Sequence, residues 1–506
     1  MNNHLRYRRQ FLISKIPVQS FDNWTCLNTG NIYIQAHPDL EVQSIKSKDT
    51  ELILLGSIFD AEYPEKTNIE IIRDITASTE SLGDLFINVK RYSGNYALLY
   101  KSSKNIIILQ DALSLREIYY CTVENNIICG SQPNLIAAFA KPHVSKTDNL
   151  DIIDFYENYM VNNRWIGDET IFHGIKHLLP NHYLDISERK VYRYWPNEPI
   201  RRLTLEDAVE PISAFLSGIL KFISNRHSLM LAVTSGTDSR TLLAASNEIK
   251  DKIYYFVNNH EYMGYDHPDI TVPKSMLDKI GIPFHIHDIP DEVCENFKQT
   301  YTDNVFFKTE RLLTAIYNIY YLNHSNKVNI TSTGEIGRSR YGVTKRKINS
   351  HLLAFKMGQN PNCRYVDIQC RKILSELSPV AAKYGLNLLT LLYWEQKIGN
   401  WGTIVNSESD IAIEEFDPSG SHYLLELLLG VDEKYTQYDE QPCCLLYQKM
   451  VSHSWPELME WPMNPPFTRR DKVLDFLRRI KMLNFLKEIK YQLSYLLYLG
   501  KKITLS

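Results

Sequence analysis

The chain has 506 residues, a length that suits two or three domains better than one. With 44% apolar residues, 23% charged residues and a formal net charge of −3, its composition is that of a soluble globular protein and excludes a global basic field for nucleic acid. The eight cysteines form no Cys-x-x-Cys pair, so we expect reduced thiols in a cytoplasmic protein and no structural zinc. No apolar run approaches the roughly 18 residues of a transmembrane helix.

Residues 1–140 predict a sheet-rich domain with one or two helices. Short apolar runs are separated by glycine and polar turns, which is typical of strands, and residues 68–79 favour a helix. The clearest strand-like runs are 31–34, 52–55, 96–100 and 106–109.

Four segments of this region resemble, in the same order, segments of the glutamine amidotransferase domain of the asparagine synthetase family; they are 56–59, 92–97, 111–120 and 128–131. The resemblance implies a β-sandwich of the N-terminal-nucleophile (Ntn) type. Enzymes of that class use an N-terminal cysteine as nucleophile, whereas this chain begins Met1-Asn2-Asn3 and its first cysteine is Cys26. We therefore expect no glutaminase activity, as in the β-lactam synthetase and lasso-peptide cyclase branches of the family.

A connecting segment is expected over residues 141–205. Within it, residues 168–184 resemble the family segment Thr-Leu-Phe-x-Gly-Ile-x-x-Leu-x-Pro-Gly-His. The rest of the chain, 206–506, is predicted to form the synthetase domain, with mostly helical structure from about residue 345 onward.

The loop Thr234-Ser235-Gly236-Thr237-Asp238-Ser239 is the most informative stretch of the chain. It follows the apolar run 229–233 and precedes the helix-like run 241–245. A strand, a polar loop and a helix N-terminus in this order present unpaired N–H groups to a phosphate. Asp238 repels a bare anion but suits Mg²⁺ that bridges it to phosphates. The loop therefore predicts ATP with pyrophosphate as the leaving group. It is not a Walker A motif, which needs a Gly-Lys-Ser/Thr ending.

The same loop resembles the pyrophosphate loop of the asparagine synthetase family, Ser-Gly-Gly-x-Asp-Ser-Ser. Thr234 falls on the first serine of that motif, Gly236 on its second glycine, and Asp238 and Ser239 on its Asp-Ser pair. Ser235 replaces the first glycine. The resemblance implies that this loop binds the nucleotide and that Asp238 positions Mg²⁺.

Beyond the loop, strand-like and helical runs alternate. The runs 253–257, 284–287 and 328–332 read as strands, and 266–280 reads as a helix. That alternation predicts a parallel sheet with ligands at the carboxyl ends of its strands. The resemblance implies that the backbone of Val233 and Val257 holds adenine.

Residues 333–341 fall on the family segment Ser-Gly-Glu-Gly-x-Asp-Glu. Gly334 is therefore a nucleotide-binding candidate, and Glu335 falls on the catalytic glutamate, implied as the base toward the amine. Arg338 replaces a Mg²⁺-binding aspartate. Two readings follow: a guanidinium that offsets the charge of the leaving pyrophosphate, or a degraded, inactive site. The retained Asp238 and Glu335 favour the first reading.

Residues 408–418 fall on a family segment whose acid orients the nucleophile, which makes Glu414 or Glu415 the candidate, with Glu414 put first. The catalytic lysine of the family is not recognisable, and Lys472 is the nearest guess.

The predicted fold is α/β and α+β: an Ntn-type β-sandwich, amidotransferase-like domain, then a pyrophosphatase-loop parallel-sheet domain with a helical lobe. The predicted function is an ATP- and Mg²⁺-dependent carbon–nitrogen ligase, which adenylates a small-molecule or peptide carboxylate and transfers it to ammonia or an amine. The open alternatives are a catalytically inactive nucleotide- or partner-binding homologue, a glutamine-dependent asparagine synthetase proper, and a tRNA sulfur-transfer enzyme. The last predicts paired cysteines and a basic face, and neither occurs. A homodimer stays open.

The tail, residues 481–502, mixes Leu, Phe and Tyr with Lys. It reads either as an amphipathic helix for a membrane surface or a partner, or as a closing helix packed on its own domain. We expect the packed helix.

Overall fold

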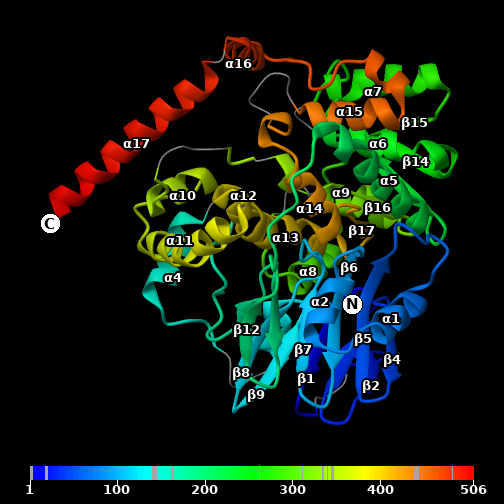
Figure 1. The fold of residues 1–506 in the computed structure, drawn as a ribbon, viewed down its shortest axis with the longest axis vertical. Coiled ribbons are helices and arrows are strands. Elements are labelled where there is room, and N and C mark those ends of the chain that lie inside the picture. Colours follow the sequence, from blue (N-terminus) through cyan, green and yellow to red (C-terminus); the bar gives the residue numbers. More distant parts are fainter. Residues whose placement is uncertain are drawn as a thin grey trace.

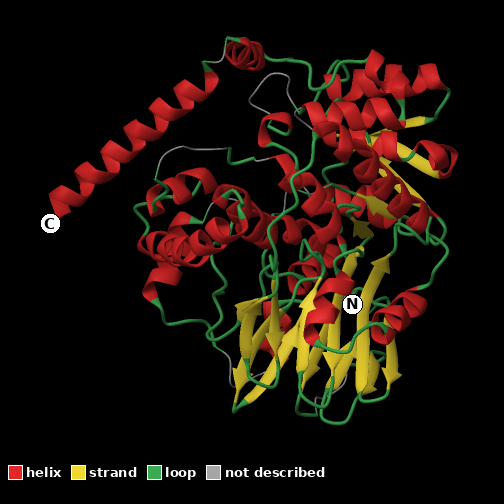
Figure 2. Cartoon of the chain, viewed as in Figure 1, coloured by secondary structure: helices red, strands yellow, loops and turns green. Residues whose placement is uncertain are grey.

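Figures 1 and 2 show the computed structural model of the chain, with a β-rich part at one end and helices around a second sheet at the other. The structure describes residues 4–17, 21–139, 145–160, 164–260, 263–309, 312–332, 335–338, 340–342, 347–437, 444–480 and 482–505. Of residues 335, 484 and 497–505 only the backbone is described.

The first part of the chain forms two antiparallel six-stranded sheets, with strand orders β10-β8-β9-β1-β3-β2 and β12-β11-β7-β6-β5-β4. The strands are β1 Phe11–Ser14, β2 Thr25–Asn28, β3 Tyr33–Ala36, β4 Val42–Ser47, β5 Thr50–Phe59, β6 Ser93–Lys101, β7 Ile106–Gln110, β8 Tyr119–Val123, β9 Asn126–Gly130, β10 Lys176–His177, β11 His182–Asp185 and β12 Lys190–Arg193. They confirm the four strand-like runs predicted in residues 31–109.

Alternating side chains of β5 explain how the two sheets pack. Ile53 and Leu55 join one apolar cluster with β1 and β3 of the opposite sheet, whereas Leu52 and Leu54 join a second cluster. Successive side chains of a strand point to opposite faces of its sheet, so β5 is buried on both. Its outer face is covered by α1 (Asn68–Ala77), which Thr67 and Glu70 begin with a capping box. The helix α1 confirms the prediction over 68–79.

The segment predicted as a connector, 141–205, contributes three strands to these sheets, because β10 pairs with β8, and β11 and β12 extend the sheet beyond β7. The sandwich therefore continues to Arg193 instead of ending at residue 140. Strands this short, two to four residues, give little hydrophobic periodicity, so sequence patterning does not reveal them.

The second part of the chain contains a five-stranded sheet with the order β15-β14-β13-β16-β17. Every neighbouring pair in it is parallel. The strands are β13 Leu229–Ala232, β14 Ile253–Asn259, β15 Phe284–Asp288, β16 Val328–Ile330 and β17 Glu414–Phe416. The predicted parallel sheet and its strands at 253–257, 284–287 and 328–332 are confirmed, and β17 adds an edge strand from a region predicted as helical.

Helices cover both faces of the parallel sheet. Leu229 and Leu231 share one apolar cluster with α5 and α6, whereas Met230 points into another with α8 and η3. The helices of this layer are α5 Leu205–Ser224, α6 Thr237–Ala245, η2 Asn247–Lys252, α7 Pro268–Ile280, α8 Glu295–Asn304, α9 Leu313–Ala315, η3 Ile316–Tyr321, η4 Glu335–Arg338, α14 His422–Gly430, η6 Glu433–Tyr435, α15 Leu445–Ser454 and η7 Pro456–Glu460.

A helical lobe lies beside the two parts and includes a long π-helical stretch, η5. Two further helices, α16 and α17, follow at the end of the chain, and α17 runs along the outside of the lobe (Figure 1). The remaining helices are α2 Leu82–Val89, α3 Pro133–Phe139, α4 Leu150–Asp154, η1 Phe155–Tyr159, α10 Ser350–Met357, α11 Arg364–Tyr384, α12 Leu388–Leu392, η5 Tyr393–Gly402, α13 Thr403–Ser409, α16 Arg469–Arg479 and α17 Leu483–Leu505.

A buried ion-pair network joins the sandwich to the parallel sheet. Arg116, 2% exposed, donates to Asp410 Oδ2 at 2.8 Å and to Glu414 Oε1 at 3.2 Å. The same guanidinium also donates to the carbonyl of Arg9 at 3.1 Å. Because Asp410 and Glu414 are about 300 positions away from Arg116 in sequence, the network holds the two parts of the chain together.

Replacing Arg116 with Met should destabilise the whole chain. Breaking a buried ion pair by removing one partner costs about 3–5 kcal/mol, because the remaining carboxylate stays buried without its cation. Urea unfolding of Arg116→Met should therefore show a free energy of unfolding lower by about 3 kcal/mol or more. The matched control is Arg371→Met, whose ion pair with Asp367 is exposed and should change that free energy by less than about 1 kcal/mol. Equal effects of the two substitutions would contradict the role of the network.

Candidate functional site

A cavity of about 510 Å³ opens at the carboxyl ends of β13 and β16. Its lining combines the loop after β13, the segment after β16, two arginines and one residue from near the C-terminus of the chain. The polar lining residues are Thr234, Gly236, Thr237, Asp238, Ser239, Asn329, Thr331, Ser332, Arg338, Arg340 and Asn464. Five of the six predicted loop residues therefore lie in one cavity.

The loop is held in shape by its own side chains. The Thr234 amide donates to Ser239 Oγ at 3.1 Å, and the Gly236 amide donates to Thr234 Oγ1 at 3.1 Å. Gly236 is the N-cap of α6, and no side chain caps that helix end. The first-turn amides of α6 are thus left to an incoming ligand, and the positive end of the helix dipole favours an anion there.

Arg240 and Asn464 anchor the chain end to this loop. Arg240 is fully buried and donates to the carbonyls of Leu458, Trp461 and Pro462 at 2.9 to 3.1 Å. Burial lowers the pKa of Arg240 to about 10, which leaves it protonated at neutral pH. The side-chain amide of Asn464 donates to Thr237 Oγ1 at 2.7 Å, and its backbone amide donates to the carbonyl of Ser235 at 2.8 Å. Neither residue was singled out from the sequence, because their partners are more than 200 positions away.

Asp238 lies between two guanidinium groups. Arg338, 3% exposed, contacts the carboxylate directly, and Arg340 Nη2 lies 3.9 Å from Asp238 Oδ2. The guanidinium of Arg338 also lies over the ring of Tyr447, 4.9 Å from its centroid. Burial is the main cause that lowers the pKa of Arg338. A guanidinium nevertheless stays protonated in proteins. Two cations and one anion give the described lining of the cavity a net positive charge.

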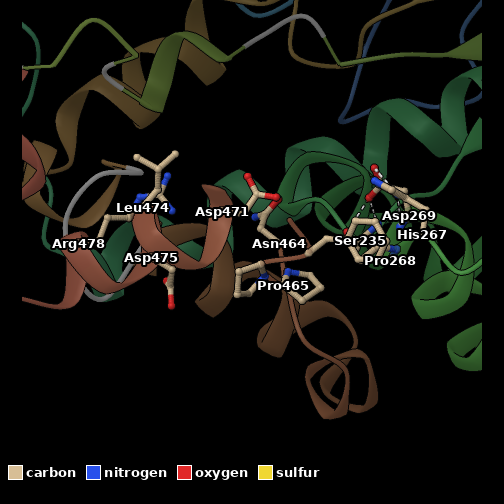
Figure 3. A pocket seen from close by; sticks show the side chains of 12 residues that line it. Ser235, His267, Pro268, Asp269, Asn464, Pro465, Asp471, Leu474, Asp475 and Arg478 are labelled. Carbon is tan, nitrogen blue, oxygen red and sulfur yellow. Dashed lines mark hydrogen bonds and ion pairs between the residues drawn. The ribbon is translucent and has the colours of Figure 1, made fainter. Parts of the chain in front are cut away.

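Ser235 faces a second cavity, of about 220 Å³. Its amide and its hydroxyl both donate to Asp269 Oδ1, at 3.0 and 2.6 Å. Figure 3 shows this pair at one end of the cavity and Asp471, Asp475 and Arg478 of α16 at the other, with Asn464 between them. Ser235 was predicted to donate a hydrogen bond to a phosphate, but in the structure it donates to the Asp269 carboxylate. Asp269 follows Pro268 at the start of α7, a position with no obvious motif.

Two other nucleotide candidates, Val233 and Val257, are not among the residues that line the cavity. Val233 is buried and its amide donates to the carbonyl of Phe256, and Val257 is buried in β14 beside β15. Gly334 and Asn2 lie outside the described residues. The backbone of Glu335 begins η4, three residues before Arg338, and nothing is described of its side chain.

The structure does not bring Glu414 to the cavity. Glu414 pairs in register with Val328, so it lies at the amino end of β17 and contacts Arg116 and Arg9 instead. The carboxyl end of the same strand leads to Asp417, which is 1% exposed. Asp417 lines a small cavity together with Asp238 and Ser332. The sequence does not show which end of this three-residue strand lies at the cavity. The parallel register with β16 shows that Asp417, and not Glu414, is on the side of the cavity.

Glu415 lies between Glu414 and Asp417 in sequence and contacts Asn329, a residue that lines the cavity. Asn329 Nδ2 donates to Glu415 Oε1 at 3.0 Å, which fixes the orientation of the amide. Asn329 Oδ1 is buried and has no hydrogen-bond partner among the described residues. Since Asn329 lines the cavity, this oxygen is an acceptor for an N–H group of a bound ligand.

The side chains of the same lining decide whether a metal ion fits the cavity. Within the described part of the chain, no group of three or more His, Cys, Asp or Glu side chains is placed to hold a metal ion. Asp238 is the one carboxylate among the described residues that line the larger cavity. Mg²⁺ commonly takes one or two carboxylates together with phosphate oxygens. The residues therefore fit an ion that enters with a triphosphate and not one held by the protein alone. Lys472, the lysine candidate, is exposed on α16.

Comparisons with known proteins found distant structural similarity. No family model and no curated protein matches the chain. The chain is similar to glutamine phosphoribosylpyrophosphate amidotransferase from B. subtilis complexed with ADP and GMP, with 11% identity, a TM-score of 0.23 and coverage of 54% of this chain and 65% of that one. It is also similar to a structure described as the allosteric regulatory enzyme of purine biosynthesis, with 11% identity, a TM-score of 0.22 and coverage of 54% and 64%. The chain thus spans less than two thirds of the length of either structure.

Substituting Ser235 should barely change nucleotide binding, because its amide and hydroxyl are occupied by Asp269. We expect Ser235→Ala to change the Kd for ATP by less than about three-fold, below about 0.7 kcal/mol. Thr234→Ala, which removes the acceptor of the Gly236 amide, should weaken binding by about ten-fold, the cost of leaving that group unpaired in the loop. Isothermal titration calorimetry measures both constants. A larger loss for Ser235→Ala would show that its hydroxyl leaves Asp269 for the ligand.

Glu415 should make the stability of the chain depend on pH. Burial raises its pKa from 4.5 to about 7 despite the hydrogen bonds from Asn329 and Ser409. A raised folded-state pKa contributes stability that is complete below pH 4.5 and is lost as pH rises through about 7. Thermal and urea unfolding between pH 4.5 and 7 should therefore show a loss of up to about 1.4 kcal/mol per pH unit, which Glu415→Gln removes. The exposed Glu248→Gln serves as the control, and an unchanged pH slope in Glu415→Gln would contradict the assignment.

Proposed function

We propose that this chain is an ATP-dependent amide-forming ligase, which adenylates a carboxylate and transfers the acyl group to ammonia or another amine. The observation that carries the proposal is the uncapped N-terminus of α6 next to Asp238, Arg338 and Arg340, in a cavity at the carboxyl edge of a parallel sheet. A helix N-terminus and two guanidiniums favour a highly charged anion. The triphosphate of ATP has the charge and length for such a cavity.

The chemistry follows from the groups around the leaving phosphates. A carboxylate oxygen attacks the α-phosphorus of ATP, the bond to the β-phosphate oxygen breaks, and pyrophosphate leaves. Negative charge develops on that pyrophosphate, and Arg338, Arg340 and the first-turn amides of α6 are the groups that stabilise it. Mg²⁺ bound to the phosphates, with Asp238 as its protein ligand, would neutralise part of the same charge.

The amine step needs an acceptor for N–H groups and a base. The amine attacks the carbonyl carbon, AMP leaves, and the nitrogen loses a proton. Asn329 Oδ1 is an unpaired acceptor in the cavity and suits an N–H donor from either substrate. Glu335 remains the predicted base, carried over from the asparagine synthetase resemblance, and its position two residues before Gly337 brings its backbone to the same turn as Arg338.

One observation favours a second function, a nucleotide-binding protein without ligase activity. Arg338 already occupies the carboxylate of Asp238. If ATP does not displace that contact, Asp238 has no oxygen for a metal, and the chain binds nucleotide without turning it over.

Pyrophosphate release from ATP distinguishes the two functions. The purified chain is incubated with Mg²⁺, a panel of amino acids, short peptides and sugar acids, and either ammonia, hydroxylamine or glutamine. We expect carboxylate-dependent release that ammonia or hydroxylamine supports. Arg338→Met should lower kcat about 100-fold or more, because it removes a cation that stabilises the leaving group. Asp238→Ala should lower kcat by a similar factor, because it removes the protein ligand of the Mg²⁺ bound to the phosphates.

The matched control is Asp432→Ala, since Asp432 is exposed and is not among the residues that line the cavity. ATP binding without pyrophosphate release under every condition would favour the inactive nucleotide-binding protein. Release supported by glutamine and accompanied by glutamate would instead favour a glutamine-dependent synthetase.

A further inference from the structure

Exposed apolar side chains gather at the end of the chain. Among the described residues, 19 large hydrophobic side chains are exposed, and 10 of them lie between residues 467 and 496. Surface patches of this kind mark sites of contact with a partner or a membrane. The ten are Phe467, Val473, Phe476, Ile480, Met482, Phe485, Leu486, Ile489, Leu493 and Leu496.

The exposed residues of α17 form one stripe. Phe485, Ile489, Leu493 and Leu496 are 61%, 40%, 58% and 62% exposed. Their spacing of three or four residues places them on one face of the helix. We call this set, together with Leu486, the apolar stripe.

A different face of α17 packs on the molecule. Tyr491 is only 6% exposed, and its ring lies 5.7 Å from that of His351 in α10. The ring of Tyr495 lies 5.1 Å from the same histidine. The expectation of a helix packed on its own domain therefore holds for the tyrosine face, while the apolar stripe on another face stays exposed.

The charge of this region is opposite to that of the rest of the chain. Residues 469–506 contain ten Lys and Arg and three Asp and Glu, a net charge of +7, so residues 1–468 carry −10. Lys490 is exposed and lies one turn after Leu486, so it borders the apolar stripe. Lys487 is two residues from Phe485 and therefore lies on the opposite side of the helix. An apolar stripe with a cationic border is the pattern of helices that lie in the interface of an anionic bilayer.

We propose that α16 and α17 bind the surface of a membrane that carries anionic lipids. In this arrangement the apolar stripe enters the boundary between headgroups and acyl chains, and Lys490 contacts the headgroups. The binding is peripheral, since no helix among the described residues is long and apolar enough to span a membrane. Charge disfavours a second copy of the chain as the occupant, because two surfaces of +7 repel each other.

The binding surface is adjacent to the candidate site. Asp471, Asp475 and Arg478 of α16 line the second cavity, whose other end is formed by Ser235 of the phosphate loop (Figure 3). A chain bound through α16 and α17 thus holds its nucleotide loop near the bilayer surface, where a lipid-linked or membrane-bound acid or amine is available.

Flotation of the full-length chain with lipid vesicles tests the proposal. We expect binding to vesicles of phosphatidylglycerol and phosphatidylcholine in equal parts at 100 mM salt, weak binding to pure phosphatidylcholine, and weaker binding at 500 mM salt. Lys490→Gln should lower the partition constant about five-fold. Phe485→Ser with Leu493→Ser and Leu496→Ser should lower it at least about ten-fold.

The matched control replaces Ile87, Leu150 and Leu322, which are 58%, 78% and 55% exposed outside this region, with Ser. That variant should bind the anionic vesicles as the unchanged chain does. Melting temperature and pyrophosphate release report whether each variant is folded and active, so a failure of the ligase proposal is seen separately from loss of vesicle binding. Absence of binding, equal binding to neutral and anionic vesicles, or a dimer in solution that the stripe substitutions dissolve would overturn the proposal.

Discussion

Because β13 and β16 are parallel neighbours, the segments that follow them leave the sheet at the same edge. The loop that contains Asp238 and the turn that contains Arg338 are thereby brought into contact, although 100 residues separate them in sequence. Every feature of the candidate site depends on this pairing. It places the open end of α6 beside two guanidiniums and lets Asn329, within β16, line the same cavity. Without the parallel register these groups would have no common ligand.

Charge in the cavity has been redistributed relative to the asparagine synthetase pattern that the sequence resembles. An arginine stands where that family has a second acid, and the structure places it directly on Asp238. A carboxylate held by a guanidinium is a weaker ligand for a resident metal, but the pair with Arg340 leaves a net positive charge for phosphates. In the proposed ligase, the phosphates are therefore held more through protein cations and helix amides than through protein-bound metal.

The two ends of the chain are both joined to the part that contains the parallel sheet. Arg9 shares Glu414 and Asp410 with Arg116, which connects the sandwich to the amino edge of the parallel sheet. Near the other end, Asn464 and the carbonyls held by Arg240 close over the loop before the chain continues into α16 and α17. The cationic helices α16 and α17 thus begin only a few residues after Asn464, which lines the larger cavity. That proximity connects the membrane proposal to the ligase proposal physically, while their tests remain independent.

The sequence by itself determined the elements with a strong local signal. The strands at 253–257 and 284–287, the helix at 68–79 and the loop before α6 follow from apolar runs, caps and turn residues, which depend on neighbours in the chain. Tertiary structure alone decided the rest. It showed that Glu414 lies at the wrong end of its strand for the cavity, that Ser235 turns to Asp269, and that segment 176–193 completes the sandwich. These outcomes depend on strand direction, register and contacts between distant residues, and no local pattern of apolar and polar residues contains that information.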